Sequence, residues 1–201
     1  MNKLRLAVFS SHSGSNFQSI IDAIKEGKLF AEIVCLITNN SNAYCVERAK
    51  QNDITYYHIS NSTHPEPSEY EKAILDVLSE NNADLIVLAG YMKMIPPTII
   101  RGYKNKILNI HPALLPKFGG KGMYGINVHK AVIESGEKVS GATVHIVDEI
   151  YDNGRILNQM LVEVSPQDTP ESLAQKVLAI EHQLYPLTIK LIAEGKIKLD
   201  N

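Results

Sequence analysis

The sequence predicts an α/β domain built on a doubly wound, mostly parallel sheet. Short apolar runs alternate with helical patterns through the first half of the chain. The runs at residues 33–37 and 85–89 are continuously apolar, as expected for strands that are covered on both faces. With 201 residues, of which 44% are hydrophobic and 21% charged, the chain suits a single globular domain with a sizeable core.

The elements are predicted in order from local patterns. Strands are expected at residues 4–9, 32–38, 55–59, 84–89 and 107–110, with helices at 16–26, 43–51, 67–81 and 96–101. A glycine-rich loop at 119–125 and a short helix at 128–134 should follow. Antiparallel strands at 139–147 and 155–164 and a final helix at 170–194 complete the C-terminal part.

Three local signals place the helix ends. Gly27 is expected to close the first helix, since glycine readily adopts the left-handed conformation found there. Ser68 with Glu71 resembles a capping box. Thr169 is expected to cap the last helix, with Pro170 in its first position.

Composition argues against several classes of protein. The formal net charge is −2 and no Lys/Arg-rich run is present, so no nucleic-acid or membrane partner is expected. The apolar run at residues 6–9 is too short for a signal peptide or a membrane span, which predicts a cytoplasmic protein. Cys35 and Cys45 lack metal-ligand spacing and are expected to be small buried hydrophobes, so no metal is predicted.

The segment 106–116 places an amide and an imidazole two positions apart, at Asn109 and His111. Residues two apart in a strand share one face, so a hydrogen-bond donor and a titratable base would stand side by side at the strand's end. A carbonyl held between them would be open to attack. The alternative is that both are turn residues, with Pro112 alone explaining why the strand stops.

The loop at residues 10–16 joins the first strand to the first helix and is rich in small polar residues. Its amides and hydroxyls suit an anion such as phosphate at the helix N-terminus. An ordinary capped turn is the alternative. It is not a dinucleotide-binding loop, because GxGxxG is missing and residues 38–40 contain no acid for a ribose.

Five motifs together carry a family resemblance. Asn-Ile-His-Pro-Ala-Leu-Leu-Pro at 109–116 resembles the signature of formyltransferases that use 10-formyltetrahydrofolate. Gly-Ser-Asn at 14–16, Ala-Gly-Tyr-Met-Lys-Met-Ile at 89–95, the acidic loop at 148–154 and Glu-His-Gln-Leu-Tyr-Pro at 181–186 are similar to motifs of the glycinamide ribonucleotide transformylases within that group. The resemblance runs along essentially the whole chain.

The resemblance implies roles for individual residues. Those implied to be catalytic are Asn109, His111 and Asp152; those implied to bind the ribonucleotide are Gly14, Ser15, Asn16, Met92 and Glu181. The implied folate-binding residues are Leu88, Met94, Ile95, Ile107, Val147, Asp148, Glu149, Ile150 and Tyr151. Without the resemblance, Asp152 before Asn153 and Gly154 would be interpreted as a turn residue.

The implied reaction moves the formyl group of 10-formyltetrahydrofolate, a co-substrate, to the amine of glycinamide ribonucleotide in de novo purine biosynthesis. Its products are formylglycinamide ribonucleotide and tetrahydrofolate. Residues 1–100 would form a ribonucleotide-binding half and 101–201 a catalytic and folate-binding half of one domain, as a monomer or homodimer. His12, Asn127 and Leu178 depart from the family pattern and put details of phosphate binding in doubt.

Two other functions stay open on the sequence. One is another folate-dependent formyl transfer, or formyl-folate hydrolysis, since such enzymes share the Asn/His/Asp set. The other is a non-catalytic nucleotide-binding regulatory module on the same sheet. His129 and His145 are candidates for supporting roles near the site, while His58, His64 and His182 are interpreted as surface or structural residues.

Overall fold

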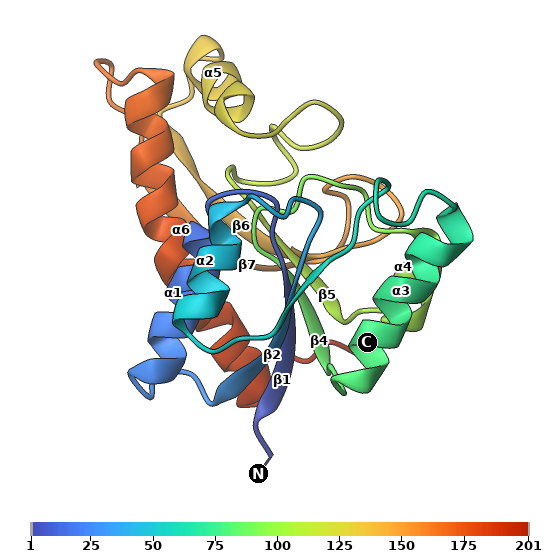
Figure 1. Ribbon diagram of the computed structural model, residues 1–201. Helices are drawn as coiled ribbons and strands as arrows, with labels where there is room; N and C mark the ends of the chain where they lie inside the picture. Colours follow the sequence, from blue (N-terminus) through green and yellow to red (C-terminus); the bar gives the residue numbers. More distant parts are fainter. Residues whose placement is uncertain (1, 201) are drawn as a thin grey trace.

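A seven-stranded sheet runs through the protein in a computed structural model, which describes residues 2–200 (Figure 1). Its strand order is β3-β2-β1-β4-β5-β6-β7. Neighbours from β3 to β5 are parallel, whereas β6 is antiparallel to both β5 and β7. The predicted fold class is therefore confirmed. The strands are β1 (Leu4–Phe9), β2 (Ala31–Thr38), β3 (Tyr56–His58), β4 (Leu85–Leu88), β5 (Ile107–His111), β6 (Val139–Ile146) and β7 (Ile156–Glu163).

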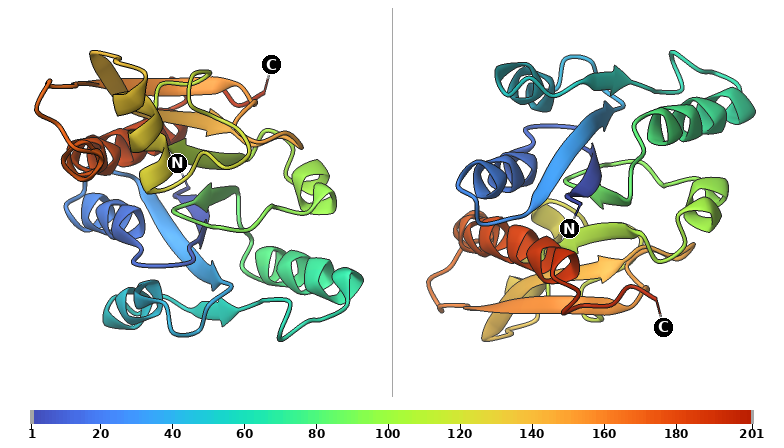
Figure 2. Two further views of the ribbon diagram at one scale, coloured as in Figure 1. Left: turned by 90° about the horizontal axis from the view of Figure 1, so that it is seen from above. Right: turned by 90° about the horizontal axis from the view of Figure 1, so that it is seen from below.

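Helices cover both faces of this sheet (Figure 2). One face carries α1 (Ser15–Lys25), α2 (Tyr44–Gln51) and α6 (Pro170–Ala193), and the other carries α3 (Pro67–Glu80) and α4 (Pro97–Gly102). The remaining helix, α5 (Ile126–Glu134), packs against α6. Two apolar cores result, and β1 alternates between them: Leu6 and Val8 belong to the first, Ala7 and Phe9 to the second.

The order of the strands reverses beside β1, whose neighbours are β2 and β4. In open α/β sheets, ligands bind at the carboxyl ends of the strands next to such a reversal. Ser11 ties the loops together there: its amide donates to the Gly90 carbonyl at 3.1 Å, and its hydroxyl accepts from the Met92 amide at 2.8 Å and donates to Asn39 Oδ1 at 2.5 Å. The loops after β1, β2 and β4 are thereby held at one edge of the sheet.

The helix-end predictions have mixed outcomes. Gly27 adopts φ 69° directly after the C-cap of α1, as predicted. Thr169 caps α6 in a capping box with Ser172, also as predicted. The capping box at Ser68 is wrong, because Pro67 takes the first helical position, Glu66 becomes the N-cap and no side chain caps α3.

Most element boundaries differ from the predictions by one or two residues. The difference that affects the site is in β5, which extends to His111 rather than ending at residue 110. His111 pairs with Thr143 of β6, so this antiparallel neighbour lengthens the strand. His111 is thus placed by regular strand geometry rather than by a turn.

Tyr185 fastens α6 to the centre of the sheet. Its side chain is fully buried, and its hydroxyl lies 3.1 Å from the carbonyl oxygens of both Leu88 in β4 and Leu108 in β5. A hydroxyl has a single proton, so the two carbonyls share one donor. This contact ties α6 to β4 at Leu88, shortly before Gly90, and to β5 at Leu108, directly before Asn109.

We expect Tyr185→Phe to lower the free energy of unfolding by about 1–2 kcal/mol, because two buried carbonyl oxygens lose a donor without loss of the ring. The midpoint of urea denaturation measures this change. Tyr44→Phe is the matched control, since Tyr44 is exposed and its hydroxyl has no such role. Equal midpoints for the two variants would show that the hydroxyl contributes nothing to stability.

Candidate active site

Asn109 is oriented by His145, its register partner on β6. The Nδ1 of His145 donates to the Ile146 carbonyl at 2.9 Å, which leaves Nε2 to pair with the side-chain amide of Asn109. Asn109 Nδ2 lies 3.1 Å from this Nε2 and donates to it. A backbone carbonyl thus sets the tautomer of the imidazole, and the imidazole sets the direction of the amide.

His111 is only 3% exposed. Its Nε2 donates to the Phe118 carbonyl at 2.8 Å, and its Nδ1 lies 3.5 Å from Asp152 Oδ2. Burial lowers the pKa of His111, although the Asp152 charge and the Phe118 hydrogen bond act in the opposite direction; the nearby His145 lowers it further. The ring is therefore neutral at neutral pH, with the Nδ1 lone pair free to accept a proton.

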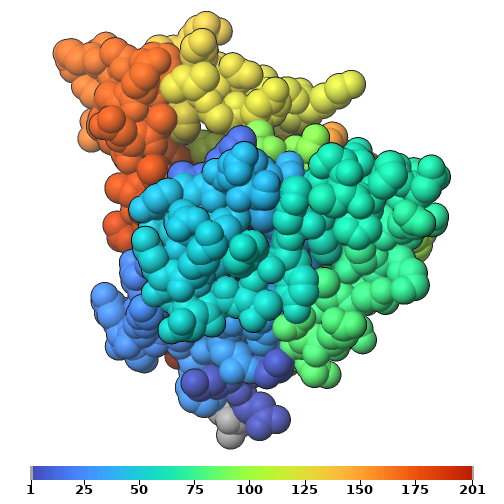
Figure 3. All heavy atoms as spheres, viewed as in Figure 1, coloured from blue at the N-terminus to red at the C-terminus, as the bar shows by residue number. Residues whose placement is uncertain are grey.

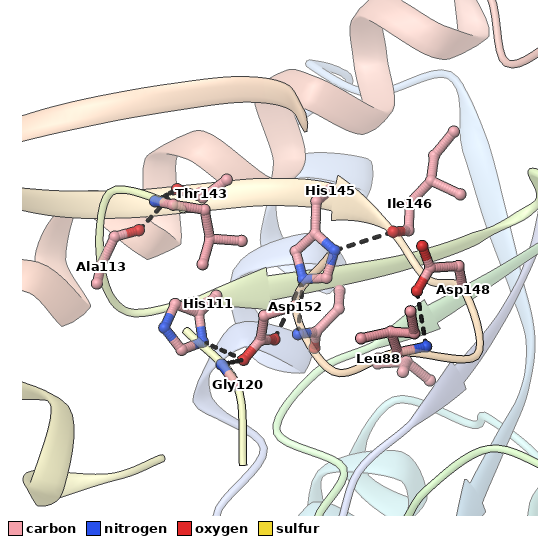
Figure 4. A network of polar contacts seen from close by, with 12 residues as sticks. Leu88, His111, Ala113, Gly120, Thr143, His145, Ile146, Asp148 and Asp152 are labelled. Atoms are coloured by element: carbon pink, nitrogen blue, oxygen red, sulfur yellow. Dashed lines mark hydrogen bonds and ion pairs between the residues drawn. The ribbon is translucent and has the colours of Figure 1, made fainter. Parts of the chain in front are cut away.

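Asp152 reaches the site from the loop between β6 and β7, where its backbone adopts φ 54° (Figure 4). Its Oδ2 accepts from the Gly120 amide at 2.9 Å, and its Oδ1 lies 3.5 Å from His145 Nε2. Burial acts to raise the pKa of Asp152, but the interactions with His145 and His111 and the Gly120 hydrogen bond outweigh it and lower the pKa. The group is a carboxylate at neutral pH.

Two cavities meet at Asn109 and Asp152. The larger, about 660 Å³, brings Asn109, His111 and Asp152 together with Asn16, Met92 and Glu181. Figure 3 shows the molecule hollowed between the yellow residues around the 119–125 loop and the blue and teal surface below them. The smaller, about 100 Å³, has a largely apolar wall and shares Asn109 and Asp152 with the first. Of the predicted folate-binding residues, it is lined by Leu88, Met94, Ile95, Val147, Asp148, Ile150 and Tyr151.

Four predicted site residues do not line either cavity. Ile107 is 0% exposed and packs in the core beneath the site. Glu149 is exposed and lies 3.4 Å from Arg101. Gly14 caps α1 with φ 67°, and a Cβ there would lie 2.7 Å from the Cβ of Cys45. Ser15 faces a separate groove between α1 and α6.

The positions that depart from the family pattern are all at the surface: His12 and Asn127 are exposed, and Leu178 is 38% exposed. Three further groups reach the site without having been singled out. Tyr91 and Lys93 line both cavities. Their place beside Met92 in the 89–95 motif is the sequence feature that points to them. The Phe118 carbonyl has no sequence signal, because any residue supplies one.

Glu181 links α6 to α1 inside the larger cavity. Its carboxylate accepts from Asn16 Nδ2 at 2.7 Å although the residue is only 7% exposed. Burial raises the pKa of Glu181 to about 7, and the Asn16 hydrogen bond acts in the opposite direction. Asn16 Oδ1 is buried and has no hydrogen-bond partner within residues 2–200. The pair can therefore offer acceptors to hydroxyl or amino groups of a ligand.

No group of three or more His, Cys, Asp or Glu side chains among residues 2–200 is arranged to hold a metal ion. None of the helices in the same part of the chain is long and apolar enough to cross a membrane.

The sequence and the fold match known proteins. The sequence model of the formyl transferase family matches residues 4–189 of the chain. The chain belongs to the formyl transferase family. The chloroplastic phosphoribosylglycinamide formyltransferase of Arabidopsis thaliana is 46% identical over 196 residues, which are 96% of this chain and 67% of that protein. The phosphoribosylglycinamide formyltransferase of Haemophilus influenzae is 40% identical over 195 residues, 97% of this chain and 90% of that protein.

The same family is found among solved structures. Glycinamide ribonucleotide transformylase 1 from Symbiobacterium toebii superposes on this formyl transferase with a TM-score of 0.91 and 35% identity, covering 99% of this chain and 92% of that one. The chain spans about two thirds of the length of the plant relatives it matches. The predicted resemblance to the glycinamide ribonucleotide transformylases is confirmed.

The raised pKa of Glu181 predicts a pH-dependent stability. Between the unfolded pKa of 4.5 and the folded value of about 7, the folded protein holds more protons than the unfolded chain, so stability falls as pH rises through this window. Glu181→Gln has no charge to bury and keeps an acceptor for Asn16. We expect the variant to gain about 3 kcal/mol relative to the wild type between pH 4.5 and 7.5.

Urea denaturation of both proteins across this pH range measures the difference, in which all other titrating groups cancel. A constant difference in stability from pH 4.5 to 7.5 would mean that Glu181 titrates normally in the folded protein.

Proposed function

We propose that this formyl transferase moves the formyl group of 10-formyltetrahydrofolate to the amine of glycinamide ribonucleotide, in de novo purine biosynthesis. The observation that carries the proposal is the meeting of two cavities at Asn109 and Asp152, with His111 in the wall of the larger one. A group transfer between two small molecules needs two adjoining binding spaces with polar groups at their junction. The relatives' names support the choice of acceptor.

The trio suits the chemistry of formyl transfer. As the amine nitrogen bonds to the formyl carbon, negative charge develops on the formyl oxygen, where the second N–H of Asn109 Nδ2 can donate. The amine must lose a proton, and neutral His111 can accept it at Nδ1 beside the Asp152 carboxylate. The bond from the formyl carbon to the folate nitrogen breaks, and that nitrogen takes up a proton, giving tetrahydrofolate and formylglycinamide ribonucleotide.

The cavities differ in the way that the two substrates require. In the larger one, Asn16 and Glu181 present polar atoms and Met92 an exposed apolar side chain, which suits the ribonucleotide. Its phosphate would bind the free amides at the start of α1, in the segment Gly14, Ser15 and Asn16. The smaller cavity has Leu88, Ile95 and Val147 in its wall and suits the flat pterin ring.

The remaining predictions form part of this proposal. A ribonucleotide half at residues 1–100 and a catalytic and folate half at 101–201 stay a prediction, although both halves contribute to both cavity walls. Ile107 would support the folate pocket from beneath, and Glu149 would act from its rim. A cytoplasmic location, and a monomer or homodimer without nucleic-acid or membrane partners, also stay predictions.

A spectrophotometric assay for tetrahydrofolate with each candidate acceptor tests the proposal. We expect product only when glycinamide ribonucleotide is present. Release of tetrahydrofolate without any acceptor would instead indicate a formyl-folate hydrolase, and product with a different amine would indicate another formyltransferase. Nucleotide binding without turnover under any condition would favour a regulatory module.

Asp152→Asn separates a catalytic carboxylate from a turn residue. Asparagine is nearly isosteric and tolerates the φ of 54°, so the loop and folate binding should persist. We expect kcat to fall by roughly 10² or more, with the folate dissociation constant and melting temperature almost unchanged. Because the Asp152 charge raises the pKa of His111, its loss should move the His111 limb of the pH profile to lower pH.

Asp53→Asn is the matched control, because Asp53 also has φ 54° but lies in the loop between α2 and β3. It should leave kcat and the pH profile unchanged. If Asp152→Asn behaved in the same way, Asp152 would return to the role of a turn residue.

A further inference from the structure

The loop at residues 112–125 supplies two contacts to the proposed catalytic groups. Its Phe118 carbonyl accepts from His111 Nε2, and its Gly120 amide donates to Asp152 Oδ2. No helix or strand lies between β5 and α5, so regular backbone hydrogen bonds do not fix this loop. Something outside the loop must therefore hold the two contacts in place.

Part of the answer is Thr143 on β6. Its hydroxyl donates to the Ala113 carbonyl at 2.6 Å and accepts from the Leu115 amide at 3.0 Å, as Figure 4 shows for the first contact. The loop lies close to β6 at this point: a Cβ on Gly141 would come within 2.6 Å of Leu114 Cδ2. Residues 113–115 of the loop thus pack against the sheet.

A further contact comes from Gln159, the register partner of Thr143 on the edge strand β7, in addition to the Lys117–Glu137 ion pair and the packing of Phe118 against the first core. Its Nε2 donates to the Leu115 carbonyl at 3.0 Å and to Thr143 Oγ1 at 2.9 Å. A primary amide has two N–H groups, so both bonds can form at once. Both contacts thus come from one side-chain atom that carries two donors.

The chemistry of Gln159 fits the free capacity of Thr143. The single proton of that hydroxyl is committed to Ala113, so a third partner must act as a donor. The amide of Gln159 is such a donor, whereas a carboxylate of the same shape is not. The amide therefore locks the hydroxyl in the direction that holds the loop.

We propose that Gln159 is a positioning residue for His111, acting through Thr143 and the Leu115 carbonyl on the loop that carries Phe118. The proposal rests on the catalytic role proposed above for His111. Gln159 itself is not among the residues that line the two cavities, and it does not touch the reacting atoms. Its task is to keep the Phe118 carbonyl where His111 Nε2 needs it, so that Nδ1 faces Asp152.

Gln159→Met and Gln159→Glu test this proposal, because both keep the length of the side chain and neither keeps the paired donors. We expect kcat to fall about tenfold in each variant, as small displacements of catalytic groups typically cause, with KM for both substrates within about twofold. The Phe118 hydrogen bond raises the pKa of His111, so weakening it should move the His111 titration to lower pH.

Asn81→Leu is the matched control, because Asn81 also donates two side-chain amide bonds, to the Val77 carbonyl at 2.8 Å and to the Tyr57 hydroxyl at 3.3 Å, but lies at the C-terminal end of α3. It should lower the melting temperature about as much as Gln159→Met while leaving kcat and the His111 titration unchanged. A purely structural role for Gln159 would give the two variants the same pattern, and that result would overturn the proposal.

NMR titration of the His111 ring keeps this test separate from the proposed function. If the wild type transferred no formyl group but Gln159→Met still moved the His111 titration to lower pH, the proposed reaction would fail while the contact chain stood. If the wild type were active and both Gln159 variants matched it in kcat and in the His111 titration, the positioning role alone would be wrong.

Discussion

The site depends on one buried carboxylate that joins three separate segments. Asp152 contacts the Gly120 amide of the 112–125 loop, His111 at the end of β5 and His145 on β6. An ionised carboxylate in a partly buried place is costly unless its oxygens are hydrogen-bonded, and here the Gly120 amide donates to Oδ2, while the two imidazoles lie 3.5 Å from the carboxylate oxygens. The same interactions hold the loop between β6 and β7 over the carboxyl ends of the strands. The position of this loop fixes where the two cavities meet.

Local sequence patterns predicted what local forces determine. The continuous apolar runs specify buried strands, and the two-residue spacing of Asn109 and His111 predicts that they share a strand face, which agrees with their place in the wall of the larger cavity. The same spacing includes Ile107, yet that residue lies deeper along the strand and packs among the residues of the second core, below the cavity. The periodicity of a strand predicts the face on which each side chain lies. It does not predict the point along the strand at which the covering helices end and the cavity begins.

The rest of the site comes from long-range contacts that no local pattern encodes. Asp152 has the sequence neighbourhood of a turn residue and indeed adopts a turn conformation, but folding brings its carboxylate to a histidine 41 positions earlier. The Phe118 carbonyl carries no side-chain signal at all. At Ser68 the local signal is wrong, because the fixed φ of Pro67 lets the helix begin at Pro67, two residues earlier than a cap at Ser68 requires, and places the serine inside it.

The charge states of His111 and Asp152 leave a hydrogen bond unmade at the site until a substrate binds. Burial keeps His111 neutral, while the contacts of Asp152 keep it ionised, so Nδ1 and Oδ2 face each other at 3.5 Å as two acceptors without a proton between them. Two acceptors at this distance gain when a donor enters, and in the proposed reaction the donor is the N–H of the amine, which gives up its proton as the nitrogen bonds to the formyl carbon. In the proposed reaction the trio would therefore be stabilised more during proton transfer than in the resting protein, which is the requirement for catalysis.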